Sequence, residues 1–420
     1  MGRQFRVKKL KGGSPVRSEI LQRVDAVFPE VVQIRRFLHE NPEISSKEFH
    51  TSRYLKEYSQ RLGLEIESVP PAGQSAGTGF IAILDTKRPG KTIGLRTDID
   101  ALPIPESKVN LAGEKAAVSR RDGAMHACGH DGHMAILLGT MNILASLREH
   151  LNGKFLFIFE EGEETGSGIH PMVERLKRKA PDVIYGNHLV SFLNTGEIAA
   201  SPGPVTSSTA RVKMKVIGRG GHASRPDRCI NPIFAGAAIL NSLAIAWSNQ
   251  LDVTKTITFG ITQFHAGEAR NVIPEEAYIG GTLRYFDREM GEAASDLIRR
   301  IAADVARAHR CRMEFYPDFG PSTPSVINDG ELSNLVRDVV RELYPGAWKD
   351  NVRWFASETF SRYRQICPTV FSFVGIRNEK VGSGAEHHNP HFDLDEESLK
   401  YAIGTMSGFA IKMSGLNRQI

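Results

Sequence analysis

Short apolar runs of strand length alternate with helix-like apolar patterns through the first half of the chain. Four of these runs end near Gly, Pro, Asp or Glu, as buried strands often do: 80–84, 92–95, 155–159 and 183–185. Apolar residues recur at helical spacing over 16–38, 133–150 and 171–179, with a kink or a break into two short helices expected at Pro29. Strands that alternate with helices in this way predict an α/β sandwich.

The pattern changes near Pro204. From Arg211 to Ile217, basic residues alternate with apolar ones, which is typical of a strand with one face in water. The next predicted elements are a helix, two strands, a helix and a strand, at 232–247, 257–264, 277–284, 289–308 and 312–316. These elements form an α+β unit, which is followed by a segment rich in Pro, Ser and Gly. We therefore predict an inserted domain at 206–321 within a larger domain made of 1–205 and 322–420.

The net charge of +5 comes from the start of the chain. Residues 1–17 contain six Lys or Arg and no acid, whereas the rest has 47 basic and 48 acidic residues. A near-neutral body gives little support to a nucleic-acid or membrane partner. The sequence also lacks an apolar stretch typical of a secretory signal or a membrane span, and its four Cys are too few for a disulfide framework. We expect a cytoplasmic protein.

The densest group of chemically active side chains lies between Met125 and His133. Three His, Cys128 and Asp131 fall within these nine residues, beside two Gly. Thiolate and imidazole groups bind divalent transition metals, and Gly lets the backbone turn so that nearby side chains converge. The segment therefore predicts a metal site.

Acidic and His residues follow the later strands. Four Glu come after the run 155–159, at positions 160, 161, 163 and 164. Two adjacent Glu at the end of a strand can provide one metal ligand and one carboxylate that takes a proton from water. His188 follows the next strand, and 386–393 contains three more His. Each group alone would suit a solvated loop, but together they predict one hydrolytic metal centre.

Six segments resemble the metal-dependent aminoacylase and carboxypeptidase superfamily, in the branch of hippurate hydrolase, auxin-conjugate hydrolases and aminobenzoyl-glutamate hydrolase. They are 35–43, 96–103, 125–133, 220–223, 271–274 and 388–392. The resemblance extends from about Ile34 to Leu399. It implies that 1–205 and 322–420 form a catalytic metal-binding domain with a zinc-peptidase-like mixed sheet. The segment 206–321 would be a ferredoxin-like lid and dimerisation domain.

The resemblance also implies the roles of individual residues. Two divalent metal ions (Mn, Zn, Co or Ni) would be held by Cys128, His130, Glu164, His188 and His388. Glu163 would be the general base, and His222 would reach the active site of a partner subunit in a homodimer or larger oligomer to stabilise the oxyanion. Asn271 and Arg284 would hold a carboxylate of a small-molecule substrate. Asp98, Asp100 and Asp131 would orient ligands or shape the ligand loop.

The expected reaction is hydrolysis of a C–N bond, with an N-acyl or N-aroyl amino acid as the substrate. Hydrolytic deamination of an activated aromatic amine, of the aminobenzoate or nitroanthranilate type, is the alternative at the same site. A metal-binding protein without catalysis is a third reading, which Glu163 argues against because a binder needs no base.

The chain departs from the pattern that it resembles in three places. Glu160-Glu161-Gly162 stands where Gln-Pro-Ala is usual, which adds two carboxylates expected to lie close to the metals. Thr359 replaces the usual acid after Glu358, and the segment 224–228 brings two extra Arg beside His222. These departures favour a substrate that differs from the usual one.

Overall fold

The computed structural model describes residues 15–70 and 77–415, which fall into two compact units. The first unit takes in the chain up to Gly203, then Ile327–Val352 and the residues from Arg362 onward. The second unit consists of Pro204–Val326 and Arg353–Ser361. The inserted segment expected at 206–321 thus lies within the second unit, which also includes the short stretch at 353–361.

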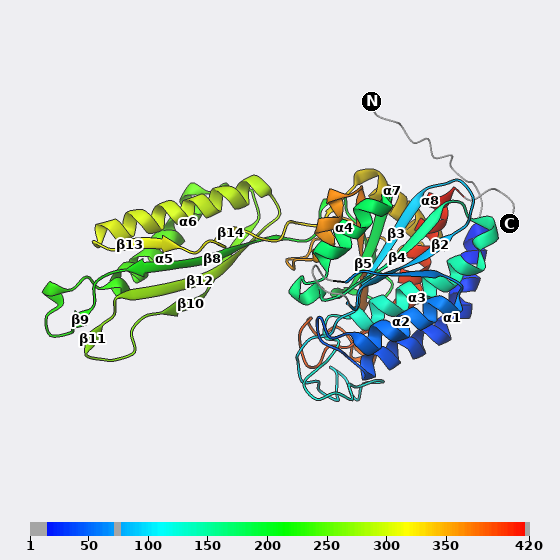
Figure 1. Ribbon diagram of the computed structural model, residues 1–420, viewed down its shortest axis with the longest axis horizontal. Helices are drawn as coiled ribbons and strands as arrows, with labels where there is room; N and C mark the ends of the chain where they lie inside the picture. The colour runs from blue at the N-terminus through cyan, green and yellow to red at the C-terminus, as the bar shows by residue number, and fades with distance from the viewer. Residues whose placement is uncertain (1–14, 71–76, 416–420) are drawn as a thin grey trace, which may run out of the picture. The chain divides into compact units, whose positions relative to one another are not determined.

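The first unit is built on a seven-stranded mixed sheet (Figure 1). In spatial order its strands are β1 (Glu65–Ser68), β2 (Phe80–Asp85), β4 (Lys154–Glu160), β3 (Thr92–Asp98), β5 (Val183–Asn194), β16 (Thr369–Arg377) and β6 (Ile198–Ala199). The strands β4, β3, β5 and β16 run parallel, and antiparallel strands border them on both sides. The parallel strands end at the same edge of the sheet, which is the usual place for a site in an α/β fold.

Six helices accompany this sheet. They are α1 (Pro15–Glu40), α2 (Phe49–Arg61), α3 (His130–Ser146), α4 (Ile169–Lys179), α7 (Gly330–Leu343) and α8 (Ser398–Ser414). Helices α1, α3 and α8 pack on one another, and α3 and α8 also contact β3. Both α3 and the central strands are buried along nearly their whole length, which accounts for their continuous apolar sequences. The predicted α/β fold with a mixed sheet is confirmed.

The second unit has a ferredoxin-like order of elements. Its main elements are β8 (Ser208–Ile217), α5 (Pro232–Gln250), β10 (Ile257–His265), β12 (Glu276–Tyr285), α6 (Arg288–Ala308) and β13 (Arg312–Phe315). The antiparallel strands lie in the order β10, β12, β8, β13, and α5 and α6 pack together against the sheet. A separate apolar core lies between the helices and the strands. The strand predicted at 211–217 alternates as expected, with buried Val212, Met214 and Val216.

Shorter elements complete the chain. They are β7 (Gly203–Pro204), β9 (Gly221–His222), β11 (Val272–Ile273), β14 (Gly320–Pro321), β15 (Ile327–Asn328) and five 3-10 turns at Arg148–His150, Glu163–Thr165, Pro226–Arg228, Thr359–Gln365 and Glu379–Val381. Strands β9 and β11 pair with each other to form a hairpin-like tip on the second unit. Within 15–70 and 77–415, no helix combines the length and the apolar character that crossing a bilayer requires.

Candidate metal centre

Four segments of the first unit bring thiol, imidazole and carboxylate groups together near the ends of β3 and β4 and the middle of β5. The sequence pattern predicts His188 after the strand at 183–185, but that strand continues to Asn194, so His188 lies within it. Cys128 and His130 flank the start of α3, Glu163 and Glu164 follow β4, and His188 lies on β5. The donor atoms of four combinations lie within 4.8 Å of one another: Cys128 with His130 and His188, Cys128 with Glu164 and His388, His130 with Glu163 and Glu164, and Asp98 with His130 and His133. The structure therefore places all five expected metal ligands and the expected base around one point.

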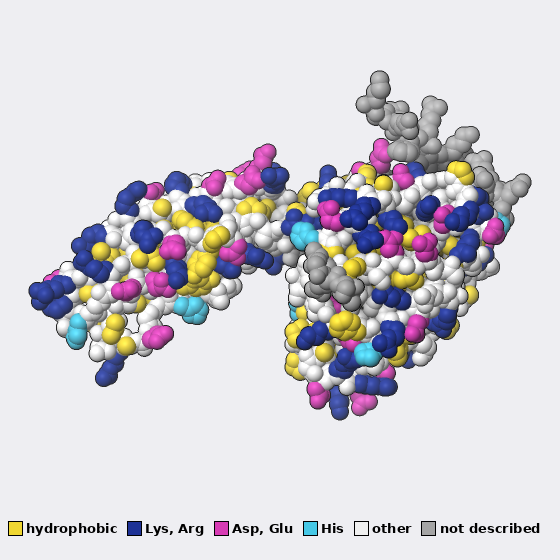
Figure 2. All heavy atoms as spheres, viewed as in Figure 1, with side chains coloured by type: hydrophobic (Ala, Val, Ile, Leu, Met, Phe, Trp, Pro, Cys, Tyr) yellow, Lys and Arg dark blue, Asp and Glu magenta, His cyan; other side chains and the backbone are white. Residues whose placement is uncertain are grey.

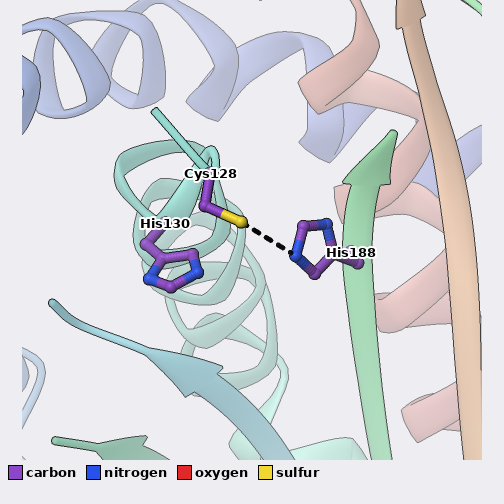
Figure 3. Close-up of side chains that lie close together, drawn as sticks. All are labelled: Cys128, His130 and His188. Atoms are coloured by element: carbon purple, nitrogen blue, oxygen red, sulfur yellow. Dashed lines mark hydrogen bonds between the residues drawn. The ribbon is translucent and has the colours of Figure 1, made fainter. Parts of the chain in front are cut away.

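Cys128, His130 and His188 form the buried side of this group (Figure 3). The Cys128 Sγ lies 3.6 Å from Nε2 of His188. Gly129 has a φ of 85°, a conformation that Gly adopts without strain, and this turn directs the side chains on either side of it toward the same space. The sequence Cys-Gly-His thus forms a compact pair of donors because its middle residue is Gly.

Hydrogen bonds fix which nitrogen of each imidazole faces the centre. Nδ1 of His130 donates to the carbonyl oxygen of Asp100 (2.9 Å), and Nδ1 of His188 donates to the carbonyl oxygen of Leu189 (2.7 Å). Both rings therefore present Nε2 as a lone-pair donor, which is the form that binds metals. The buried Nε2 of His130 makes no hydrogen bond to any described residue. A buried nitrogen whose lone pair has no hydrogen-bond partner is suited to binding a metal.

Glu164 and His388 form the second, less buried side of the group. Oε1 of Glu164 lies 3.3 Å from Nε2 of His388 and 3.9 Å from Nε2 of His130. The backbone N–H of Glu164 donates to Oδ2 of Asp100 (3.0 Å), and that of His388 donates to the carbonyl oxygen of Ala127 (2.9 Å). His388 has a φ of 61°, a strained value for a residue other than Gly, which the surrounding contacts maintain.

The pKa values of the buried donors show that charge is disfavoured on Cys128 and His188 but favoured on His130. Burial, with the charge of Glu164, raises the pKa of the Cys128 thiol, and burial lowers the pKa of His188. Burial also opposes charge on His130, but the carboxylates of Asp98 and Asp100 raise its pKa. A thiol, neutral imidazoles and a carboxylate are a donor set that suits Zn, Mn, Co or Ni. The residues present therefore fit a divalent metal.

Two of the three Asp residues expected near the centre contact the expected ligands or their neighbours. Asp100 accepts from His130 Nδ1 through its carboxylate (3.1 Å) as well as its carbonyl. Asp98 accepts from Nδ1 of His133 (2.8 Å), and Nε2 of His133 accepts from the N–H of Leu189 (2.9 Å). Both nitrogens of His133 are therefore already engaged, so this His supports the site without offering a donor to a metal.

Asp131 belongs to a buried ionic network that the sequence did not indicate. It accepts from Nε of Arg35 (2.8 Å) and from Nδ1 of His39 (2.8 Å), and Nε2 of His39 donates to Glu106 (2.8 Å). Burial opposes protonation of His39, but the acids on both sides of the ring raise its pKa. The network ties α1 to the first turn of α3, immediately after His130.

The two extra carboxylates before Glu163 are committed to structural partners. Glu160 accepts from Nε of Arg96 (2.9 Å) and from the hydroxyl of Tyr363 (2.6 Å). Glu161 accepts from the N–H groups of Thr78 and Gly79 (2.5 and 2.8 Å). Neither Glu belongs to any of the candidate metal-holding groups among the described residues. Both side chains therefore fix the end of β4 and the segment that follows it.

The remaining expected site residues lie in the second unit. His222 is exposed on β9, and its Nδ1 accepts from the N–H of Ser224 (3.1 Å), so a neutral ring carries its proton on Nε2. Asn271 lies directly before β11, where its carbonyl accepts from the N–H of Ala223 (3.0 Å). Figure 2 shows basic and His side chains at this end of the unit.

Arg284 lies on β12 and is half-buried. Its Nη1 is buried and makes no hydrogen bond to a described residue, and burial lowers the pKa of the guanidinium. A buried guanidinium with an unsatisfied N–H suits a site for an anion.

Comparison with known proteins agrees with this geometry. The sequence pattern that defines peptidase family M20/M25/M40 matches residues 94–412. The N-acetylcysteine deacetylase of Bacillus subtilis is 34% identical over 92% of this chain and 97% of its own length, and IAA-amino acid hydrolase ILR1-like 4 of Arabidopsis thaliana is 30% identical over 93% and 88%. The crystal structure of the Bacillus subtilis YXEP protein, described as a dinuclear metal-binding peptidase of the M20 family, covers 94% of this chain and 100% of its own, with 30% identity and a TM-score of 0.79. The chain is a hydrolase that belongs to the M20/M25/M40 peptidase family.

Proposed function

We propose that this protein is a metal-dependent amidohydrolase that cleaves the amide bond of an N-acyl or N-aroyl amino acid. The observation that carries the proposal is the convergence of Cys128, His130, Glu164, His188 and His388 on one point, with Glu163 beside it. A binding protein would need the donors but no adjacent carboxylate. The similarity to a deacetylase and to an amino acid conjugate hydrolase supports the substrate class.

The chain's own residues provide the other parts of the reaction. The five donors would hold two divalent ions, which when bound lower the pKa of a water and polarise the scissile carbonyl. The Glu163 carboxylate accepts the proton of the attacking water and delivers it to the leaving nitrogen. Donor atoms of Glu163, Glu164 and His130 lie within 4.8 Å of one another, so the proposed base lies beside two of the proposed ligands.

His222 and Arg284 would complete the site from the second unit. With Nδ1 occupied by the N–H of Ser224, the Nε2–H of His222 is a donor suited to a developing oxyanion. The unsatisfied Nη1 of Arg284, with Asn271, would bind the substrate carboxylate. In this proposal His222 acts in the site of a second copy of the chain.

The function is tested by turnover of a substrate panel after supplementation with Mn, Zn, Co or Ni. The panel holds hippurate, other N-acyl and aminobenzoyl amino acids, and ring-substituted anthranilates. Release of an amino acid that chelation abolishes is the expected result. Release of ammonia from an anthranilate would instead assign hydrolytic deamination, and chelator-sensitive metal binding without any turnover would favour a non-catalytic protein.

A homodimer formed through the second unit is the expected assembly. Strand β10 lies at the edge of its sheet, and beside it is an apolar groove of about 540 Å³ lined by residues such as Trp247, Phe259 and Ile261. Such an edge readily pairs with a second copy of itself. Light scattering should give a mass near twice 46.4 kDa. Ile261→Lys should yield the single-chain mass, whereas Ala303→Lys on the exposed side of α6 should not; a wild-type monomer would exclude this assembly.

A further inference from the structure

A single hydroxyl group lies between two buried carboxyl groups beside the turn that carries Glu163 and Glu164. Oγ1 of Thr78 is 2.8 Å from Oε2 of Glu48 and 2.8 Å from Oε2 of Glu161. All three residues are buried: Glu48 is 0% exposed, Thr78 is 2% exposed and Glu161 is 3% exposed. A Thr hydroxyl has one proton to donate, so it can satisfy only one of two carboxylate oxygens. The second short contact therefore requires a proton on one of the carboxyl groups.

The placement of the surrounding hydrogen bonds shows which oxygen has room for that proton. Oε2 of Glu161, which faces the hydroxyl, also accepts from the N–H groups of Thr78 and Gly79. In Glu48 the N–H groups of Ser46 and Gly162 both donate to Oε1, so among the described residues Oε2 faces the Thr78 hydroxyl alone. Burial raises the pKa of Glu48 to about 7, and the nearby charge of Asp100 adds to this effect. The charge of Lys56 interacts with Glu161. Glu48 is thus the protonated partner: it donates to Thr78, and Thr78 donates to Glu161.

Glu48 also holds the catalytic turn directly. Its other oxygen, Oε1, accepts from the N–H of Gly162 (2.9 Å), where the chain turns with a φ of 58° into Glu163. Three residues earlier, the hydroxyl of Ser45 donates to Oδ2 of Asp100 (2.7 Å), the same oxygen that accepts from the N–H of Glu164. The segment before α2 therefore fastens the turn at both of its ends.

We propose that Glu48 is a positioning residue that holds the Glu163–Glu164 turn in place through a carboxyl group that keeps its proton in the folded protein. The inference rests on the proposed function, because the turn matters through the catalytic role of Glu163. It also gives a purpose to Glu161, one of the residues at which the chain departs from the pattern that it resembles. Glu161 supplies the second carboxylate that makes the proton necessary.

The proton is tested by stability, without any assay of activity. An unfolded Glu48 would release its proton near the ordinary value of 4.5, whereas the folded one keeps it to about 7. The stabilising contribution of this proton is therefore present below 4.5 and is lost as the pH rises toward 7. Glu48→Gln copies the protonated acid, with a donor toward Thr78 and an acceptor toward Gly162. Its melting temperature relative to wild type should rise by several degrees between about pH 5 and 8.

Two further variants complete the test. Glu57→Gln, an exposed change on α2, the helix that follows Glu48, should show a constant difference from wild type over this pH range. Glu161→Gln should weaken the pH dependence without abolishing it, because Thr78 is then free to donate to an ionised Glu48 while burial still opposes the charge. A melting difference for Glu48→Gln that does not vary with pH would overturn the assignment of the proton.

The positioning role is tested by turnover on whichever substrate the panel identifies. Glu48→Gln should keep kcat within about twofold, whereas Glu48→Ala, which has no acceptor for Gly162, should lower kcat by about ten- to a hundredfold with bound metal and KM little changed. Equal kcat for Glu48→Ala and wild type would overturn the role. If wild type turns over no substrate, the proposed function fails, while the melting comparison still decides whether Glu48 is protonated.

Discussion

Replacing Glu163 with Gln should lower kcat by about 10²- to 10⁴-fold, which is the usual contribution of a general base. Gln has nearly the same shape as Glu but cannot accept a proton from water at neutral pH. Because Glu163 is not one of the five proposed ligands, the metal content of the variant should equal that of wild type. Steady-state kinetics and elemental analysis on the same preparation would measure both quantities.

A matched control strengthens this comparison. Glu149 is an exposed acid in the 3-10 turn after α3, and Glu149→Gln should leave kcat and metal content unchanged. The acid limb of the pH profile should also disappear in Glu163→Gln, since the group that must be ionised is gone. A kcat within twofold of wild type would mean that another group takes the proton.

Replacing His188 with Ala should remove one of the two proposed metal ions and bring turnover to background. The hydrogen bond from Nδ1 to the carbonyl of Leu189 aims Nε2 of this ring at the Cys128 thiol, 3.6 Å away. Without the ring, the remaining donors are too few to close the coordination of one of the two proposed ions. The number of ions per chain should fall by about one, as measured by elemental analysis after gel filtration.

The control for this variant is a His outside the centre. His150 is exposed at the end of the 3-10 turn that follows α3, and His150→Ala should retain wild-type metal content and kcat. Full metal occupancy in His188→Ala would contradict the proposed ligand set. Addition of excess metal that restores turnover in the variant would indicate weakened binding and would leave the ligand set in place.

Sequence patterns predicted the helices and strands of both units well where one face of the element is buried or where the whole element is buried. The alternation at 211–217 and the apolar run at 155–159 correspond to β8 and β4. At Pro29 the pattern left open a kink or two helices, and the structure has one helix, Pro15–Glu40. Buried Val24 and Val31 lie on either side of Pro29 in the same core, so tertiary packing compensates for the missing N–H.

Long-range hydrogen bonds explain what the sequence could not predict. The five-ligand set came from the resemblance, and only the fold shows that the donor atoms converge. Residue type alone does not distinguish His133, whose nitrogens are both engaged, from His130, whose Nε2 lacks a partner among the described residues. The roles of Glu160 and Glu161 were also not predictable from residue type, because their hydrogen-bond partners Arg96 and Thr78 come from distant parts of the chain.

The insertion of the second unit between β5 and β16 also sets the order in which the metal centre is made. Strands β5 and β16 are neighbours in the sheet, yet the inserted unit separates them along the chain. During synthesis from the N-terminus, Cys128, His130, Glu164 and His188 emerge first, and His388 emerges only after the whole inserted unit. That unit has its own apolar core and can fold in the interval. Four of the five proposed donors therefore precede the inserted unit along the chain and the fifth follows it, so the proposed set can be complete only after both parts of the first unit have been synthesised.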